Sequence, residues 1–138
     1  MNSFEWSAEY SVAHDTMDNH HQWLFDILND INCGLKENVS QDRIFTYMQE
    51  LREYTNFHFS EEEKLMAEIG YPDLDAHKAL HQGFIQQIQA YMNEFQTVEC
   101  GETKCGIAEK IRVMGTDWLK NHICVADKRY GEYLKNLK

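Results

Sequence analysis

Apolar residues recur along most of the chain at the 3.6-residue period of an amphipathic α-helix. Four such stripes follow one another, and the breaks between them hold residues that are typical of helix ends. Ser40 can cap the start of the second helix, Gly70 can close it, and Pro72 can open the third. We therefore predict four helices, at about residues 18–37, 41–69, 73–97 and 106–130, with a loop from Gly101 to Gly106 before the last of them.

Four long helices joined by short connections predict an all-α fold, an antiparallel up-down-up-down four-helix bundle. Residues 1–17 precede the first stripe, and we predict that they form an extended arm that packs on the bundle through Phe4, Trp6, Tyr10 and Val12. The 138 residues suit a single domain with its own core, which we place at 1–138. One proline and seven glycines are too few for a turn-rich all-β fold.

The chain is acidic, because 13 lysines and arginines stand against 23 aspartates and glutamates, a formal net charge of −10. This charge disfavours nucleic acid and anionic membranes as partners and opposes loose self-association, so we expect a monomer. The sequence lacks the run of about 18 apolar residues that a membrane span requires. Its first residues lack the basic and apolar regions of a signal peptide, so we expect a cytoplasmic protein.

A cytoplasmic location implies that the four cysteines are reduced. Cys33 and Cys124 fall within helical patterns and are expected to be small buried side chains. Cys100 and Cys105 flank the predicted loop and are expected to be two loop thiols.

Polar residues that interrupt the apolar stripes point to chemistry. Each predicted helix carries at least one imidazole on its apolar face, and the second also carries a carboxylate: His21, His58, Glu62, His77, His81 and His122. Residues four apart share a helix face, as in the pairs His58–Glu62 and His77–His81. Several imidazoles and a carboxylate in an apolar interior are costly unless they are paired. No lysine or arginine stands at a matching position, so a metal site best explains the group.

The donor set favours two first-row transition ions, iron above all, because five imidazoles exceed the needs of one ion and calcium or magnesium would require oxygen ligands. The sequence contains no E-x-x-H, which argues against a ferritin-like di-iron site. A second carboxylate could come from Asp117 or Asp127, each five residues from His122. Five residues turn an ideal α-helix about 140° off the face, so spacing does not choose between them.

Four segments resemble the hemerythrin family in its bacterial single-domain form. Residues 18–25, DNHHQWLF, resemble D-x-Q-H-x-x-L-F, and residues 58–66, HFSEEEKLM, resemble H-F-x-x-E-E-x-L-M. Residues 77–81 form H-x-x-x-H, and residues 118–127 form W-L-x-x-H-I-x-x-x-D. Each segment is short, but the four occur in order on four different helices, and the resemblance extends from Trp6 to about Tyr130.

The resemblance implies a hemerythrin-like domain with seven ligands to two iron ions (Fe2+/Fe3+): His21, His58, Glu62, His77, His81, His122 and Asp127. It implies that the last three histidines hold one iron, that the first two hold the other, and that Glu62, Asp127 and a solvent-derived oxygen bridge them. It further implies an apolar oxygen pocket lined by Phe59, Trp118, Leu119 and Ile123. His20 departs from the family pattern, where glutamine is frequent, and we interpret Glu61 and Glu63 as a solvated face.

The resemblance favours reversible dioxygen binding for storage, delivery or sensing, in a protein that is not an enzyme. Its partners would be dioxygen and an unidentified electron donor or oxygen recipient. Two alternatives stay open: a di-iron redox enzyme that reduces peroxide or nitric oxide, and an iron store or donor. An oxygenated spectrum that is lost under inert gas, turnover with a reductant, and ready loss of iron to chelators would distinguish the three.

Overall fold

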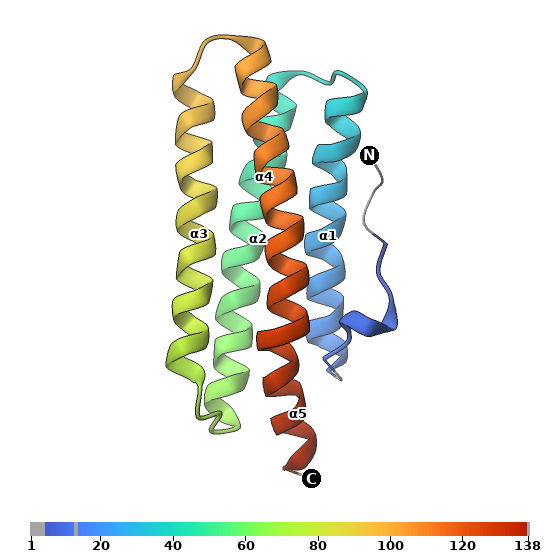
Figure 1. Ribbon diagram of the computed structural model, residues 1–138, viewed down its shortest axis with the longest axis vertical. Helices are drawn as coiled ribbons and strands as arrows, with labels where there is room; N and C mark the ends of the chain where they lie inside the picture. The colour runs from blue at the N-terminus through green and yellow to red at the C-terminus, as the bar shows by residue number, and fades with distance from the viewer. Residues whose placement is uncertain (1–4, 13, 138) are drawn as a thin grey trace.

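The computed structural model describes residues 5–12 and 14–137, and these contain helices and turns but no strand. A short 3-10 turn, η1 (Ala8–Tyr10), precedes four long helices: α1 (Asp15–Lys36), α2 (Gln41–Glu68), α3 (Leu74–Thr97) and α4 (Gly101–His122). A π-helical turn, η2 (Ile123–Asp127), leads directly into α5 (Lys128–Asn136). The four long helices run alternately up and down (Figure 1), which confirms the predicted all-α four-helix bundle.

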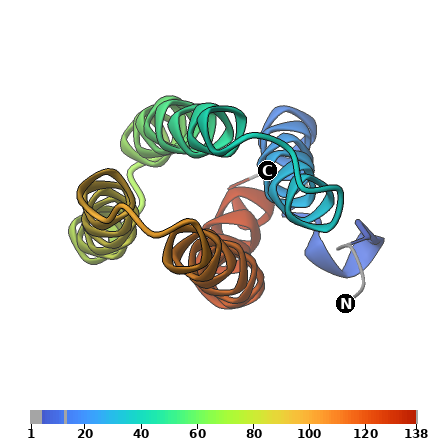
Figure 2. The same ribbon diagram turned by 90° about the horizontal axis from the view of Figure 1, so that it is seen from above.

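The helices are arranged so that neighbours in the sequence are neighbours in space. Seen from above, they stand in the order α1, α2, α3, α4 around a central core (Figure 2), and α4 closes the ring by packing against α1. The apolar stripes supply this core, in which Leu24, Leu28, Met48, Leu51 and Ile88 are fully buried. Burial of the stripes is therefore the main stabilising contribution to the bundle.

Local signals at the helix ends explain most of the boundaries. The Ser40 hydroxyl accepts a hydrogen bond from the backbone N–H of Arg43 at 3.2 Å and caps α2. Gly70, just after α2, has a φ of 68°, a left-handed conformation that favours glycine. The first helix begins at Asp15, three residues earlier than expected, because Nδ1 of His14 accepts from the N–H of Met17 and acts as the cap.

The fourth helix also begins earlier than predicted, because residues 101–106 are helical and do not form a loop. The N–H of Lys104 bonds to the carbonyl of Cys100 at 3.0 Å, which closes the first turn. Glu102 lies in that turn, where a negative charge interacts favourably with the helix dipole. The Lys104 ammonium lies 4.7 Å from the centre of the Phe95 ring and ties the turn to α3. These contacts outweigh the low helix propensity of two glycines.

All four cysteines fall within the described ranges, and all are free and exposed, so the expected burial of Cys33 and Cys124 is wrong. Cys33 lies two residues from both Ile31 and Leu35, and two residues of an α-helix turn about 200°. This places the Cys33 thiol on the face opposite the stripe.

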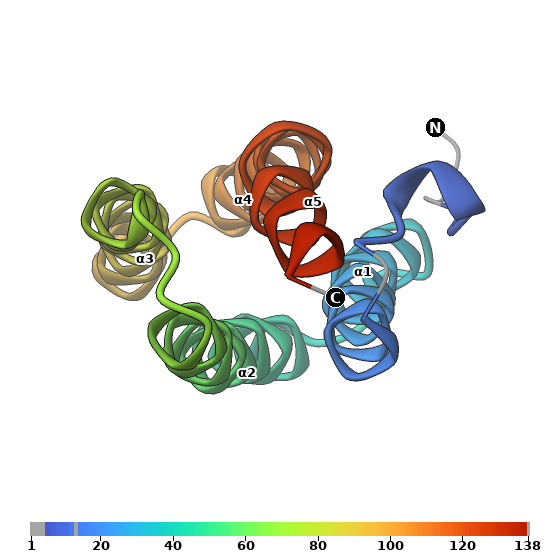
Figure 3. The same ribbon diagram turned by 90° about the horizontal axis from the view of Figure 1, so that it is seen from below.

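Two additional segments pack against the bundle toward its lower end, as drawn in Figure 1. Seen from below, α5 leans from α4 across this end toward α1 (Figure 3). The arm follows α1 on the outside, where Val12 is buried and its N–H bonds to Oδ1 of Asp18 at 2.9 Å. Trp6 and Tyr10 pack on the core, η1 makes the arm only partly extended, and Phe4 lies outside the described residues. Nowhere in the described ranges does a helix have the length and apolar character needed to cross a membrane.

Candidate metal centre

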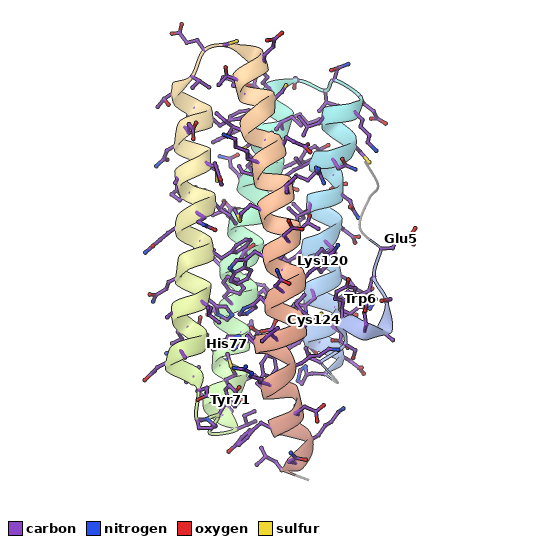
Figure 4. The ribbon with its side chains drawn as sticks, viewed as in Figure 1. Glu5, Trp6, Tyr71, His77, Lys120 and Cys124 are labelled. Atoms are coloured by element: carbon purple, nitrogen blue, oxygen red, sulfur yellow. The ribbon has the colours of Figure 1, made fainter. Side chains whose placement is uncertain are left out.

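Seven buried ionisable side chains meet inside the bundle, one or two from each long helix and one from the π-helical turn. They are His21 from α1, His58 and Glu62 from α2, His77 and His81 from α3, His122 from α4 and Asp127 from η2. None is more than 6% exposed, and Glu62, His21 and Asp127 are fully buried. Figure 4 labels His77 near the end of the bundle at which the α2–α3 connection and α5 lie.

The two carboxylates divide the imidazoles into two groups. Oε1 of Glu62 lies 3.1 Å from Nε2 of His77 and 3.0 Å from Nε2 of His81. Its other oxygen, Oε2, lies 3.4 Å from Nε2 of His21 and 3.3 Å from Nε2 of His58.

Asp127, like Glu62, faces both histidine groups. Its Oδ1 lies 2.8 Å from Nε2 of His77 and 3.0 Å from Nε2 of His122, whereas Oδ2 lies 3.1 Å from Nε2 of His21. Each carboxylate therefore presents one oxygen to a three-histidine group and the other oxygen to a two-histidine group.

The π-helical turn explains how Asp127 reaches the centre. An α-helix would place it about 140° from the face of His122. In η2 the hydrogen bonds join residues five apart, so each turn holds more residues and position i+5 returns toward the face of position i. Asp117, the alternative with the same spacing, lies in α4 and is exposed. The structure thus brings Asp127, and not Asp117, to the imidazoles.

Several side chains of the cluster have pKa values shifted toward their charged forms, although burial alone would favour the neutral forms. Burial lowers the pKa of an imidazole, but the carboxylates of Asp127 and Glu62 raise the pKa of His21 and of His77 to about 9. Burial and the neighbouring Glu62 raise the pKa of Asp127, but the imidazoles, His122 foremost, reverse this and hold it below its usual range. The pKa of Glu62 is likewise lowered, by His58 above all, against the effect of burial. Without a metal, His21 and His77, whose pKa values are raised, are the positive partners of the two carboxylates.

Several buried polar atoms of the cluster nevertheless lack a hydrogen bond, and binding to a metal would satisfy them. Both ring nitrogens of His21 and both carboxylate oxygens of Asp127 are buried without a hydrogen-bond partner of acceptable geometry. Such atoms are costly in a protein interior. Two sets of donor atoms each lie within 4.8 Å of one another: five residues around the three-histidine group and four around the two-histidine group. Nitrogen and carboxylate donors in this number suit two first-row transition ions.

Aromatic rings shield one side of the cluster. Phe59 stacks on His81 with ring centres 3.7 Å apart, and Trp118 stacks on His122 at 4.3 Å. Both rings therefore lie against the three-histidine group. The other two expected pocket residues, Leu119 and Ile123, are buried.

Four contacts around the cluster are not predicted by the sequence. Nδ1 of His81 lies 2.8 Å from Oε2 of Glu63, so the interpretation of Glu63 as a solvated residue is wrong. Nδ1 of His58 lies 3.0 Å from Nδ1 of His20.

The Tyr130 hydroxyl donates to Oε2 of Glu62 at 2.8 Å, and the Trp6 ring lies 6.5 Å from that of His21. The sequence does not predict either contact. The contact of Trp6 depends on how the arm packs against α1, and that of Tyr130 depends on how α5 packs on the end of the bundle.

Comparison with known proteins gives one consistent result. The family described as "Hemerythrin HHE cation binding domain" matches residues 12–134. A bacteriohemerythrin of Clostridium acetobutylicum is 35% identical over 92% of this chain and 98% of its own length. A myohemerythrin of Theromyzon tessulatum is 25% identical over 92% of this chain and 90% of its own. A crystal structure of wild-type hemerythrin superposes with a TM-score of 0.78 at 28% identity, covering 94% of this chain and 95% of that one.

Proposed function

The chain belongs to the hemerythrin family, and we propose that it binds dioxygen reversibly at two iron ions held by the seven buried side chains of the candidate metal centre. One observation carries this proposal: each of two buried carboxylates offers one oxygen to each histidine group. A carboxylate that faces two groups of nitrogen donors has the arrangement of a bridging ligand. When bound, the iron pair supplies the two electrons and the open coordination position that reversible dioxygen binding requires.

The ligand groups differ in the number of donors that they offer. His77, His81 and His122 with the two carboxylates make five, whereas His21 and His58 with the same carboxylates make four. Glu62 and Asp127 are the proposed bridges, together with a solvent-derived oxygen. The open position is therefore assigned to the ion beside His21 and His58.

The chain's own side chains have three tasks around this pair. The Tyr130 hydroxyl, by donating to Glu62, orients one bridging carboxylate. Phe59 and Trp118 lie against the three-histidine group, and with the buried Leu119 and Ile123 they form the proposed apolar oxygen pocket, whose task is to exclude water. Trp6, held in the arm, lies with its ring centre 6.5 Å from that of His21, one of the two histidines beside the proposed open position.

The test is anaerobic reconstitution of the purified chain with ferrous iron, followed by absorption spectra as air is admitted and then replaced by argon. We expect a band that forms in air and is lost under argon over repeated cycles. Asp127→Asn and His81→Ala should abolish the band, whereas the matched change Asp117→Asn, at an exposed carboxylate, should leave it intact. An unchanged spectrum in Asp127→Asn would remove this residue from the site.

The same preparation tests the other functions. Sustained consumption of peroxide or nitric oxide with a reductant would identify a redox enzyme supplied by an electron donor. Rapid transfer of the iron to a chelator would identify an iron store or donor. A monomeric, cytoplasmic protein stays our prediction, which size-exclusion chromatography and cell fractionation would check.

A further inference from the structure

One proposed ligand in each histidine group has a side-chain partner on the side away from the cluster, and these two partners differ. In the two-histidine group, Nδ1 of His58 faces Nδ1 of His20 at 3.0 Å. In the three-histidine group, Nδ1 of His81 faces a carboxylate oxygen of Glu63 at 2.8 Å. One ligand thus has an imidazole as its outer neighbour, and the other has a carboxylate.

The direction of both hydrogen bonds follows from ligation. Nε2 of His58 and Nε2 of His81 point into the cluster, so a metal-bound ring carries its proton on Nδ1. This Nδ1–H donates outward, to Nδ1 of His20 in one case and to the Glu63 carboxylate in the other. A charged acceptor makes the stronger hydrogen bond and draws the donating ring toward imidazolate character, which strengthens it as a ligand.

Both outer neighbours are held in place. The His20 ring meets that of His58 edge-on at 5.1 Å, and Tyr54 and Phe57 pack around it at 5.9 and 5.3 Å. Glu63 follows the proposed ligand Glu62 on α2, and its side chain is only 26% exposed. Neither contact therefore depends on a freely moving surface side chain.

We propose that His20 and Glu63 are positioning residues that make the two metal positions unequal: Glu63 strengthens His81 at the three-histidine position, and His20 orients His58 at the weaker, two-histidine position. This inference rests on the ligand set of the proposed function. It assigns to His20, where this chain departs from the resemblance, the role of a neutral hydrogen-bond acceptor.

The experiment uses zinc, which is redox-inert, and measures the two stepwise affinities of the full chain by competition with a chromophoric chelator. Removal of an outer partner of a metal ligand typically lowers affinity 10–100-fold. We expect His20→Ala to weaken the second zinc by about that factor, and His20→Gln, whose amide oxygen still accepts, to restore it. Glu63→Gln should weaken the first zinc about tenfold, because a neutral acceptor replaces a charged one. Glu61→Gln, the same charge change two residues away, serves as the control.

Nuclear magnetic resonance of the zinc-loaded protein separates positioning from packing. The Nδ1–H protons of His58 and His81 should be observed at low field and exchange slowly with water. His20→Ala should move and expose only the first signal, and Glu63→Gln should move only the second. If both zinc ions bind but these signals and both affinities stay unchanged, the inference is overturned while the proposed function stands. If zinc is not taken up by the unaltered chain, the ligand set itself fails.

Discussion

The sharpest structural prediction concerns Gly131, which faces the backbone of the N-terminal arm. A Cβ atom at this position would lie 2.5 Å from the carbonyl oxygen of Val12, far inside ordinary contact, and the obstacle is backbone that cannot rotate away. In Gly131→Ala the arm must therefore retreat by about 1 Å to restore normal packing. This displacement disturbs the burial of Val12, which is 2% exposed, and its 2.9 Å hydrogen bond to Asp18.

The expected loss in the free energy of unfolding follows from the burial and the hydrogen bond of Val12 that the substitution disturbs. Full burial of a valine side chain contributes about 1.5–3 kcal/mol, and a typical hydrogen bond about 1 kcal/mol. Alanine in place of glycine within a helix returns about 0.5–1 kcal/mol. We expect Gly131→Ala to lower the free energy of unfolding by about 2 kcal/mol, which corresponds to about 7 °C in the midpoint of thermal unfolding for a chain of this size.

Thermal unfolding of the metal-free protein, followed by circular dichroism, measures this shift. Gly83→Ala and Gly106→Ala are matched controls, because both glycines lie in long helices and an added Cβ meets nothing within 4 Å. The controls should raise the midpoint slightly. A Gly131→Ala variant that is as stable as these controls would refute the account of arm docking.

Three further predictions concern the centre. Tyr130→Phe removes the hydroxyl that donates to the buried Glu62. It should lower the free energy of unfolding of the metal-free protein by about 1–3 kcal/mol, measured by urea unfolding. An unchanged urea midpoint would contradict this role of Tyr130. Because the pKa values of His21 and His77 are raised to about 9, their stabilisation of the metal-free protein is fully present below pH 6.5 and is lost as the pH rises through 9. Urea midpoints at pH 6, 8 and 10 should therefore fall in that order, and a flat profile would contradict the assigned charges. Trp6→Ala should accelerate loss of the oxygenated spectrum in air several-fold, because it removes the ring that packs beside His21. An equal rate would show that the arm does not shield the iron pair.

The sequence predicts most of the fold because repeated apolar positions leave few alternatives for burial. Stripes through Leu24, Leu28 and Leu51 predict helices whose faces do meet in the core. The i,i+4 pairs His58–Glu62 and His77–His81 predict shared faces for a purely geometric reason, and both pairs point into the cluster.

The remainder of the site depends on features that periodicity does not encode. Asp127 reaches the centre through a π-helical turn, which the spacing of residues in a regular α-helix does not predict. Only the family resemblance therefore selected Asp127 over Asp117. Glu63 follows Glu62 on α2 and points about 100° away from it, off the face of the ligands. Its contact with His81 depends on how α3 packs against α2. Tyr130 contacts Glu62 only because η2 and α5 fold over the end of the bundle.

Two carboxylates, each facing both histidine groups, are proposed to hold two metal ions in one buried site. Counting the iron bound to anaerobically reconstituted, desalted protein, while circular dichroism reports its helical content, tests this proposal. We expect two iron ions per folded chain, falling to one or fewer in Glu62→Gln. A fully helical protein that retains no iron, or that retains two in Glu62→Gln, would contradict it.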